Sequence, residues 1–216
     1  MCVIMVKPVG VRVPPPWAFE QAYRKNPHGA GFAVADPDRM RVVIRKGFRS
    51  GDAARRGLLE EIAALRRTPR GVLAVVHFRL ATHGSHSDAN CHPFPLSGDT
   101  GKLRAAAISC RTAVAHNGIL PVAIPPGEDI SDTMSFVRES LSKLRFSEIV
   151  RRRDEITRFL GQGRLAVLHH DQRCLRLGEF VRFRGCYWSN RTFFVPPVLR
   201  RRKEDKNDQP GYSRAG

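Results

Sequence analysis

The chain has 216 residues, enough for one large domain, and 42% of them are hydrophobic, which is sufficient for a substantial core. Lys and Arg number 37 against 20 Asp and Glu, so the formal net charge is +17. These proportions exclude fibrous, collagen-like and wholly disordered chains.

The first half of the chain predicts short strands separated by two helices. Apolar runs mark the strands, and Leu58, Ile62 and Leu65 recur at helical spacing in the clearest helix. In chain order we expect a strand at 2–6, a helix at 17–25, a strand pair at 31–36 and 41–46, a helix at 52–67 and a buried strand at 71–81.

The second half begins with a polar loop at 82–101 and returns to apolar segments. We expect strands at 105–109 and 112–116, helices at 132–144 (capped by Ser131) and 147–160, a hairpin from 164–170 and 173–180, and closing segments at 183–190 and 193–196. Hairpins outnumber βαβ units in this order, which favours an α+β fold of stacked, mainly antiparallel sheets with helices outside. The predicted domain covers residues 1–198, and the charged, aperiodic tail at 199–216 is predicted to be disordered.

The positive charge is not confined to that tail. Residues 199–216 hold six basic and three acidic side chains, so about +14 of the net charge belongs to the rest of the chain. Such a field attracts nucleic acid, anionic metabolites or acidic protein surfaces, unless it only reflects an arginine-rich composition. Since no motif that reads RNA or DNA is found, nucleic acid is a possible partner from charge only.

The cysteines and the apolar segments bear on the compartment. Five cysteines are widely spaced without a Cys-x-x-Cys pair, which disfavours a disulfide framework and a zinc ribbon and indicates a reducing setting. We find no signal peptide and no stretch near the roughly 20 apolar residues of a membrane span. We therefore expect a cytoplasmic protein that has no membrane partner.

Cys2 is the first candidate for chemistry. Removal of the initiator methionine would leave a thiol and an α-amine on the same residue. An α-amine has an ordinary pKa of about 7.7–8.0, so part of it is neutral at physiological pH and can take the thiol proton. The alternative is a small buried side chain at the start of a strand.

Three further positions each have a functional and a structural interpretation. Arg79, after a long apolar run, suits bidentate binding of a carboxylate, or an internal salt bridge. Asn117-Gly118 suits an oxyanion hole, or a two-residue hairpin turn. Asp132 suits binding of an ammonium group, or stabilisation of a helix N-terminus. Taken together with Cys2, the functional interpretations describe an amino acid with a side-chain amide, and L-glutamine fits all of them.

Two other patterns are discounted. His83, His86, Cys91 and His92 lie within ten residues, but their spacings match no standard zinc pattern, so we expect no metal. Gly29-Ala30-Gly31 resembles the start of a dinucleotide fingerprint, but a third glycine and a βαβ unit are missing. We expect no cofactor.

The chain resembles the class II glutamine amidotransferases, whose nucleophile is N-terminal. Its pieces occur in the family's order over residues 2–196: Met1-Cys2, Gly29-x-Gly31, Arg79-Leu80-Ala81-Thr82-His83-Gly84, Asn90, His92-Pro93, His116-Asn117-Gly118, Ser131-Asp132-Thr133 and Tyr187-Trp188-Ser189-Asn190. Leu80 stands where the family often has an aromatic residue, Met134 where it often has an acid, and His28 where Asp is common.

The resemblance implies a four-layer αββα sandwich of the Ntn-hydrolase type. It assigns Cys2 as the nucleophile, Arg79 as the clamp on the α-carboxylate, Asn117 and Gly118 as the oxyanion hole, and Asp132 as the partner of the α-ammonium. Thr82, His83 and Gly118 would line the pocket.

Most relatives carry a synthase that uses the released ammonia, so a separate synthase subunit is an expected partner. The alternatives are an Ntn hydrolase of another γ-glutamyl amide and a non-catalytic basic module that binds nucleic acid.

Overall fold

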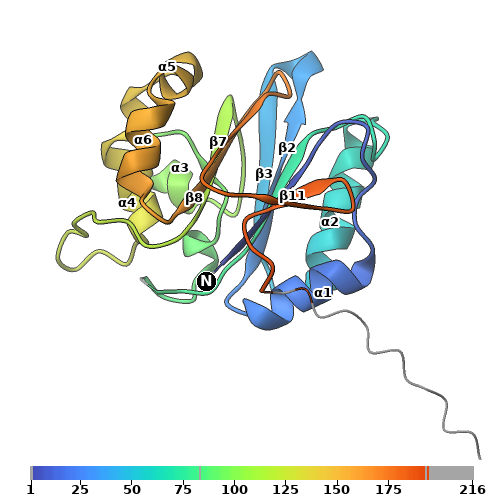
Figure 1. Cartoon of the computed structure of the whole chain (residues 1–216), viewed down its shortest axis with the longest axis horizontal. Coiled ribbons are helices and arrows are strands. Elements are labelled where there is room, and N and C mark those ends of the chain that lie inside the picture. Colours follow the sequence, from blue (N-terminus) through green and yellow to red (C-terminus); the bar gives the residue numbers. More distant parts are fainter. Residues whose placement is uncertain (1, 83, 193, 195–216) are drawn as a thin grey trace, which may run out of the picture.

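The structure is a computed structural model that describes residues 2–82, 84–192 and 194 (Figure 1). The predicted domain end at 198 and the predicted disordered tail at 199–216 lie outside these residues. None of the described helices is both long and apolar enough to cross a membrane.

Two antiparallel sheets form the centre of the fold. The larger has the strand order β10-β11-β1-β4-β2-β3-β6, and the smaller has the order β5-β7-β8-β9. The larger sheet consists of β1 (Val3–Lys7), β2 (Ala30–Asp36), β3 (Arg41–Phe48), β4 (Ala74–Phe78), β6 (Ala107–Cys110), β10 (Val181–Phe183) and β11 (Cys186–Trp188). The smaller sheet consists of β5 (Phe94–Pro95), β7 (Thr112–Asn117), β8 (Arg164–His169) and β9 (Cys174–Leu177).

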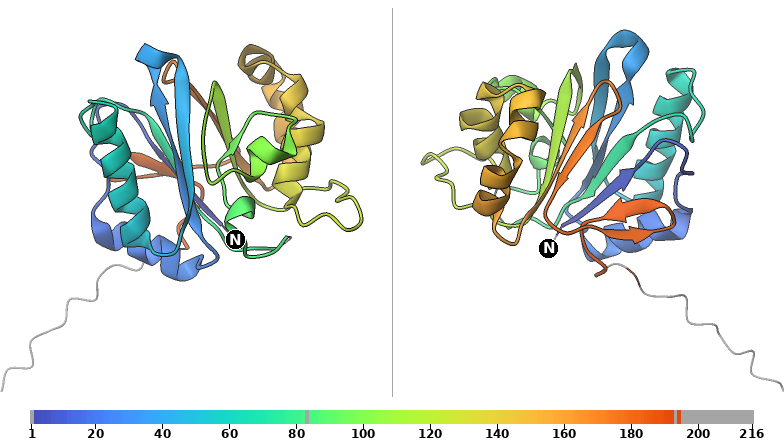
Figure 2. Two further views of the ribbon diagram at one scale, coloured as in Figure 1. Left: turned by 180° about the vertical axis from the view of Figure 1, so that it is seen from behind. Right: turned by 45° about the horizontal axis from the view of Figure 1, so that its top comes forward.

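Helices cover the outer face of each sheet, which gives an order of helices, sheet, sheet, helices (Figures 1 and 2). The larger sheet is covered by α1 (Pro16–Lys25) and α2 (Gly51–Ala64). The smaller sheet is covered by α4 (Asp132–Glu139), α5 (Phe146–Arg151) and α6 (Arg153–Leu160). The remaining segments are α3 (Thr100–Arg104) and the 3-10 turns η1 (Pro37–Arg39), η2 (Asp88–Asn90) and η3 (Leu141–Lys143).

Three hydrophobic clusters correspond to these layers. One joins the larger sheet to α1 and α2 through residues such as Phe19, Phe32 and Leu58. Another joins the smaller sheet to α4–α6, and the third fills the space between the sheets with small and branched side chains such as Ile4 and Ala115. A strand between two clusters is buried on both faces, which is why β1 and β7 are read as continuous apolar runs.

Most predicted elements are confirmed, and the differences lie in the helices of the second half, in the partners of two strands, and in the expected loop at 82–101, which contains β5 and the start of α3. The expected closing segment at 193–196 lies outside the described residues except for Phe194. The helix expected at 132–144 ends at Glu139 and is followed by η3. The helix expected at 147–160 is two helices that meet at Arg152. The strands expected at 105–109 and 112–116 belong to different sheets, because β6 pairs with β3 while β7 pairs with β5 and β8.

A buried lysine fastens the long polar loop to the larger sheet. Lys46 of β3 is only 6% exposed, and its Nζ donates hydrogen bonds to the carbonyls of Ala89 (2.8 Å) and Leu103 (2.6 Å). The ammonium also lies 4.6 Å from the centre of the Phe94 ring. Burial lowers the pKa of Lys46 to about 7.

We therefore expect Lys46 to make stability depend on pH. Its pKa in the folded state lies below that of the unfolded chain, so the unfolded chain binds more protons between these values and stability rises with pH. From pH 7 to 8.5 the contribution is about 1–2 kcal/mol. Urea unfolding should show that Lys46→Met loses this rise, while the exposed control Lys25→Met keeps it. Equal slopes in both variants would refute the assignment.

Candidate active site

Cys2 lies directly before β1, which is flanked by β4 and β11 and is therefore held on both sides. Its thiol sits against the backbone of Leu80, whose N–H donates to Sγ (3.3 Å) and whose carbonyl accepts from Sγ (3.4 Å). The carbonyl of Cys2 accepts a hydrogen bond from Nδ2 of Asn190 (2.8 Å). Both the sulfur and the backbone of Cys2 thus have fixed positions.

Burial raises the pKa of the Cys2 thiol above its ordinary value, while the backbone hydrogen bond with Leu80 and the charge of Arg79 act in the opposite direction. The thiol is therefore protonated at neutral pH. A reaction at this sulfur requires a base that removes the proton.

Asn117 and Gly118 lie at the end of β7, in the neighbouring sheet. Together with Cys2 they line a cavity of about 300 Å³. Asn117 is the last residue of β7, which pairs with β8 and β5 rather than with the segment that follows Gly118, so the hairpin-turn interpretation is wrong. Gly118 has φ of +150°, a backbone conformation that L side chains rarely adopt.

The hydroxyl of Ser189 orients the Asn117 amide. Asn117 Nδ2 donates to Ser189 Oγ (2.9 Å), and the same oxygen accepts from the backbone N–H of Ile4 (2.9 Å). Asn117 Oδ1 is buried and has no hydrogen-bond partner among the described residues. The unsatisfied atom is an acceptor, so it can receive a hydrogen bond from a ligand, whereas Nδ2 has a second N–H besides the one that it donates to Ser189.

Arg79 follows β4 and is 2% exposed. Its guanidinium donates to the carbonyls of Ser85 (2.6 Å) and Gly84 (3.4 Å). These hydrogen bonds tie it to the polar loop, and it lines a small cavity together with Cys2 and Asp132.

Asp132 is the first residue of α4, and Ser131 caps this helix by accepting from the N–H of Met134 (3.1 Å), as predicted. One carboxylate oxygen of Asp132 accepts from the N–H of Leu120 (2.8 Å), and the other from the N–H of Thr133 (2.7 Å). The carboxylate therefore stabilises the helix start and also faces the small cavity, so its two interpretations are compatible.

The two cavities meet at Cys2, and Thr82 lines both. The cavity with Arg79 and Asp132 measures about 20 Å³, which is room for about one water molecule. The larger cavity is more apolar, and the exposed Ile119 lies at its wall.

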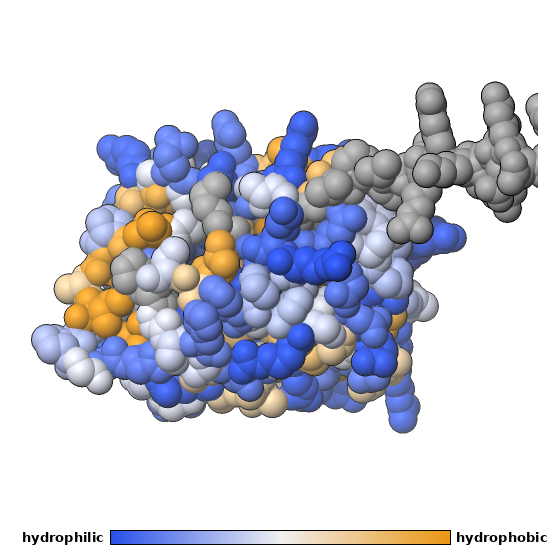
Figure 3. Space-filling model, turned by 90° about the horizontal axis from the view of Figure 1, so that it is seen from below, coloured by the Kyte–Doolittle hydropathy of each residue, from blue (hydrophilic) through white to orange (hydrophobic). Residues whose placement is uncertain are grey.

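Seen from below, hydrophobic residues gather on the side of the molecule where α4–α6 lie (Figure 3). His83 lies outside the described residues.

Three buried histidines support the site, and sequence reasoning did not assign them roles. His77 Nε2 contacts the carbonyl of His116 (3.1 Å), and His116 Nδ1 contacts Thr133 Oγ1 (3.1 Å). His92 Nδ1 accepts from the N–H of His116 (3.3 Å). Burial lowers the pKa of His77 to about 3, that of His116 to about 4 and that of His92 well below its ordinary value, so all three are neutral at pH 7.

The early glycines allow the polar loop to approach β2. A Cβ at Gly29 would meet Cys91 Sγ at 2.4 Å, and one at Gly31 would meet the carbonyl of His92 at 2.3 Å. Gly29 and Gly31 are therefore packing glycines. In the described part of the chain no group of three or more His, Cys, Asp or Glu side chains could hold a metal ion.

Two of the three departures from the family pattern have a structural explanation. His28 Nδ1 accepts from the N–H of Ala81 (2.9 Å), and its ring stacks on that of His86 with 3.8 Å between centres. Met134 is buried in the cluster beneath α4. Leu80 contacts the thiol only through backbone atoms in the hydrogen bonds described above, so those bonds do not require an aromatic side chain.

Comparisons with known proteins bear on the fold and on part of the sequence. The chain is 35% identical over 91 residues to glutamine–fructose-6-phosphate aminotransferase (isomerizing) of two Thermus thermophilus strains; the match covers 42% of this chain and 12% of the relative. The fold matches glutamine phosphoribosylpyrophosphate amidotransferase from B. subtilis with a TM-score of 0.50 at 14% identity, over 90% of this chain and 43% of that one. The sequence match covers part of the chain and the structural match shows a shared fold, and both agree with the resemblance to the class II glutamine amidotransferases.

The chain thus corresponds to a small part of the curated relatives that it matches and to less than half of the solved enzyme. No family model matches it. The two antiparallel sheets agree with the fold that the resemblance implied.

The close packing around Gly118 can be tested by measuring the free energy of unfolding of a variant. A Cβ there would lie 2.9 Å from Gly163 Cα and 3.1 Å from His116 Nε2, in addition to the strained φ. We expect Gly118→Ala to lower the free energy of unfolding by about 3 kcal/mol. The control Gly127→Ala, with φ of +81° and open space around it, should cost only about 1–2 kcal/mol. Urea unfolding measures both, and equal losses would contradict the close packing at Gly118.

Proposed function

We propose that this chain is a glutamine amidotransferase domain that releases ammonia from L-glutamine through a thioester on Cys2. The observation that carries the proposal is the position of the Cys2 thiol between two sets of groups. One set, Arg79 and Asp132, offers opposite charges, and the other, Asn117 and Gly118, offers hydrogen-bond donors. Glutamine has an ammonium, a carboxylate and an amide that match these groups.

Arg79 and Asp132 bind the amino-acid end of the substrate in this proposal. The guanidinium binds the α-carboxylate, and the carboxylate of Asp132 binds the α-ammonium, since charge-assisted hydrogen bonds are the strongest available. A cavity of about 20 Å³ is too small for these groups, so the residues that line it, Thr82 among them, have to move when glutamine binds. In this proposal Thr82 and His83 line the glutamine pocket.

The chemical step begins after removal of Met1. The freed α-amine of Cys2 takes the thiol proton, which is needed because the thiol is protonated at neutral pH. The thiolate attacks the δ-carbon of glutamine, and the oxyanion accepts hydrogen bonds from Asn117 Nδ2 and the N–H of Gly118. Loss of one such donor typically lowers the rate by about 10²–10³.

The intermediate then collapses. The α-ammonium of Cys2 returns its proton to the leaving nitrogen, ammonia departs, and a γ-glutamyl thioester remains on Cys2. Water hydrolyses the thioester, which gives glutamate and restores the thiol. The ammonia passes to a separate synthase or acceptor protein.

Two alternatives are separable from this function. An Ntn hydrolase of another γ-glutamyl amide would cleave other amides faster than glutamine in a substrate screen. A non-catalytic basic module would bind nucleic acid with a steep dependence on salt and would release no glutamate. The joint presence of the thiol, the charged pair and the amide at one place favours the enzyme.

Cys2→Ala should abolish release of glutamate from glutamine and also labelling by an electrophilic glutamine analogue. Intact mass should show that the wild-type protein has lost Met1 and carries one adduct, located on Cys2. The matched control is Cys110→Ala, because burial raises the pKa of Cys110 to about 12 and keeps that thiol unreactive. Retained activity in Cys2→Ala, or an adduct on another cysteine, would exclude Cys2 as the nucleophile.

Asp132→Asn should raise KM for glutamine by roughly tenfold or more with a smaller change in kcat, because it removes the charge that binds the α-ammonium. The amide oxygen can still accept from the N–H of Leu120, while the hydrogen bond from Thr133 is lost, and thermal unfolding checks that the variant is folded. Arg79→Lys should act in the same direction. The control Asp38→Asn changes an exposed carboxylate and should leave KM unchanged. A normal KM in Asp132→Asn and Arg79→Lys would rule out this mode of binding.

A further inference from the structure

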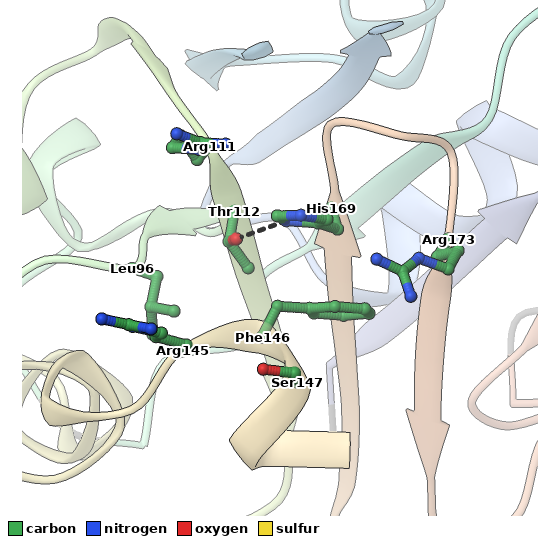
Figure 4. A pocket seen from close by; sticks show the side chains of 8 residues that line it. All are labelled: Leu96, Arg111, Thr112, Arg145, Phe146, Ser147, His169 and Arg173. Atoms are coloured by element: carbon green, nitrogen blue, oxygen red, sulfur yellow. Dashed lines mark hydrogen bonds between the residues drawn. The ribbon is translucent and has the colours of Figure 1, made fainter. Parts of the chain in front are cut away.

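A further cavity, of about 590 Å³, lies where β7 begins and β8 ends (Figure 4). Thr112, the first residue of β7, lines it, whereas Asn117 at the other end of β7 belongs to the candidate active site. His169 of β8, the register partner of Thr112, lies beside it. The two sites are thus separated by the length of one strand.

The cavity is bordered by basic side chains. Arg111, Arg145 and Arg173 come from three separate segments and surround the Thr112–His169 pair (Figure 4). None of the residues that line the cavity is acidic. Arg173 pairs with Asp171 just outside it (2.6 Å).

Arg111 and Arg145 differ from Arg173 in their partners. Within the described part of the chain, neither has a carboxylate within 4 Å of its guanidinium. The nearby Glu148 accepts from the backbone N–H of Arg145 (2.7 Å) and forms its ion pair with Arg151 (3.8 Å). Two guanidinium groups therefore border the cavity without a compensating negative charge.

The remaining wall includes Phe146, Thr112 and His169, which contacts the other two. The ring of Phe146 is stacked on that of His169, with 4.6 Å between centres and an angle of 2°, and the Arg173 guanidinium lies 5.2 Å from the Phe146 ring centre. Thr112 Oγ1 is 2.8 Å from His169 Nδ1. Burial lowers the pKa of His169, and the charges of His170, Arg173 and Arg111 add to this while Asp171 opposes it.

We propose that this cavity binds a phosphorylated small molecule, whose phosphate groups are held by Arg111 and Arg145 with Arg173 at the rim. The planar guanidinium matches a phosphate by two parallel hydrogen bonds, and several of them around one space suit a ligand with more than one negative charge. The exposed hydroxyl of Ser147 supplies a further donor. Phe146 already contacts His169 and Arg173, so recognition depends on the anion rather than on stacking of a base.

A concave site favours a small ligand over a nucleic acid strand. Nucleic acid binding uses a charged stripe that follows the backbone, often with exposed aromatic rings, whereas the one aromatic ring here, Phe146, is buried. The volume exceeds that of a single phosphate ion and leaves room for the group to which the phosphate is attached.

The test is a titration of the full chain with pyrophosphate, followed by calorimetry and by the NMR signals of the histidine rings. We expect saturable binding of one equivalent and a shift of the His169 signals. Arg111→Gln combined with Arg145→Gln should weaken binding roughly tenfold or more. The control pair Arg24→Gln with Arg70→Gln removes the same charge from exposed positions elsewhere and should bind like the wild type. Thermal unfolding establishes that each variant is folded.

Several results would overturn the proposal. The first is equal affinity in both double variants, which would make the binding a general effect of charge. Another is the absence of saturable binding by the wild type, or binding that leaves the His169 signals unchanged. Tighter binding of citrate would indicate a carboxylate ligand, and displacement of pyrophosphate by a tighter-binding RNA oligonucleotide would indicate a nucleic acid surface. None of these readouts depends on glutamine hydrolysis.

Discussion

The hydroxyl of Ser189 connects the two sheets where the candidate active site is formed. Its oxygen accepts one hydrogen bond from the backbone of Ile4 in the larger sheet and one from the side chain of Asn117 in the smaller sheet. The thiol of Cys2 belongs to the first sheet and the amide of Asn117 to the second, so their relative position depends on how the sheets meet. The hydrogen bonds at this junction are directional, so they specify that position in addition to the apolar contacts between the sheets.

Burial then determines the charges that surround the thiol. Three histidines between the sheets are kept neutral by desolvation, so they supply hydrogen bonds without adding positive charge. Arg79 and Asp132 are therefore the opposite charges that face Cys2 across the small cavity. Because the histidines are neutral and the two charged side chains have opposite signs, the small cavity favours a zwitterionic ligand over a simple anion or cation.

The sequence allowed the strands to be predicted better than the helices. The residues singled out for chemistry, such as Cys2, Arg79 and Asn117, line two adjoining cavities, and their roles stay predictions. Runs such as residues 2–6 are apolar throughout because both faces of the strand are buried, and this signal is unambiguous. The break at Arg152 was missed because Ile149 and Ile156 are seven residues apart, a spacing that one continuous helix would also produce. The contacts of His77 and His116 were missed because a single polar residue inside an apolar strand has no period, although its presence in such a run is itself a signal of a polar contact.

Strand β7 extends from the basic cavity to the candidate active site. Its first residue, Thr112, lies in the basic cavity and its last, Asn117, in the candidate active site, while the residues between them are packed against both neighbouring layers. A strand buried on both faces does not bend independently of its neighbours, so a ligand that shifts Thr112 along the strand axis also shifts Asn117. Thr112 and Asn117 thus belong to one buried strand, and an effect of one ligand on the binding of the other would have to be reciprocal in their binding free energies.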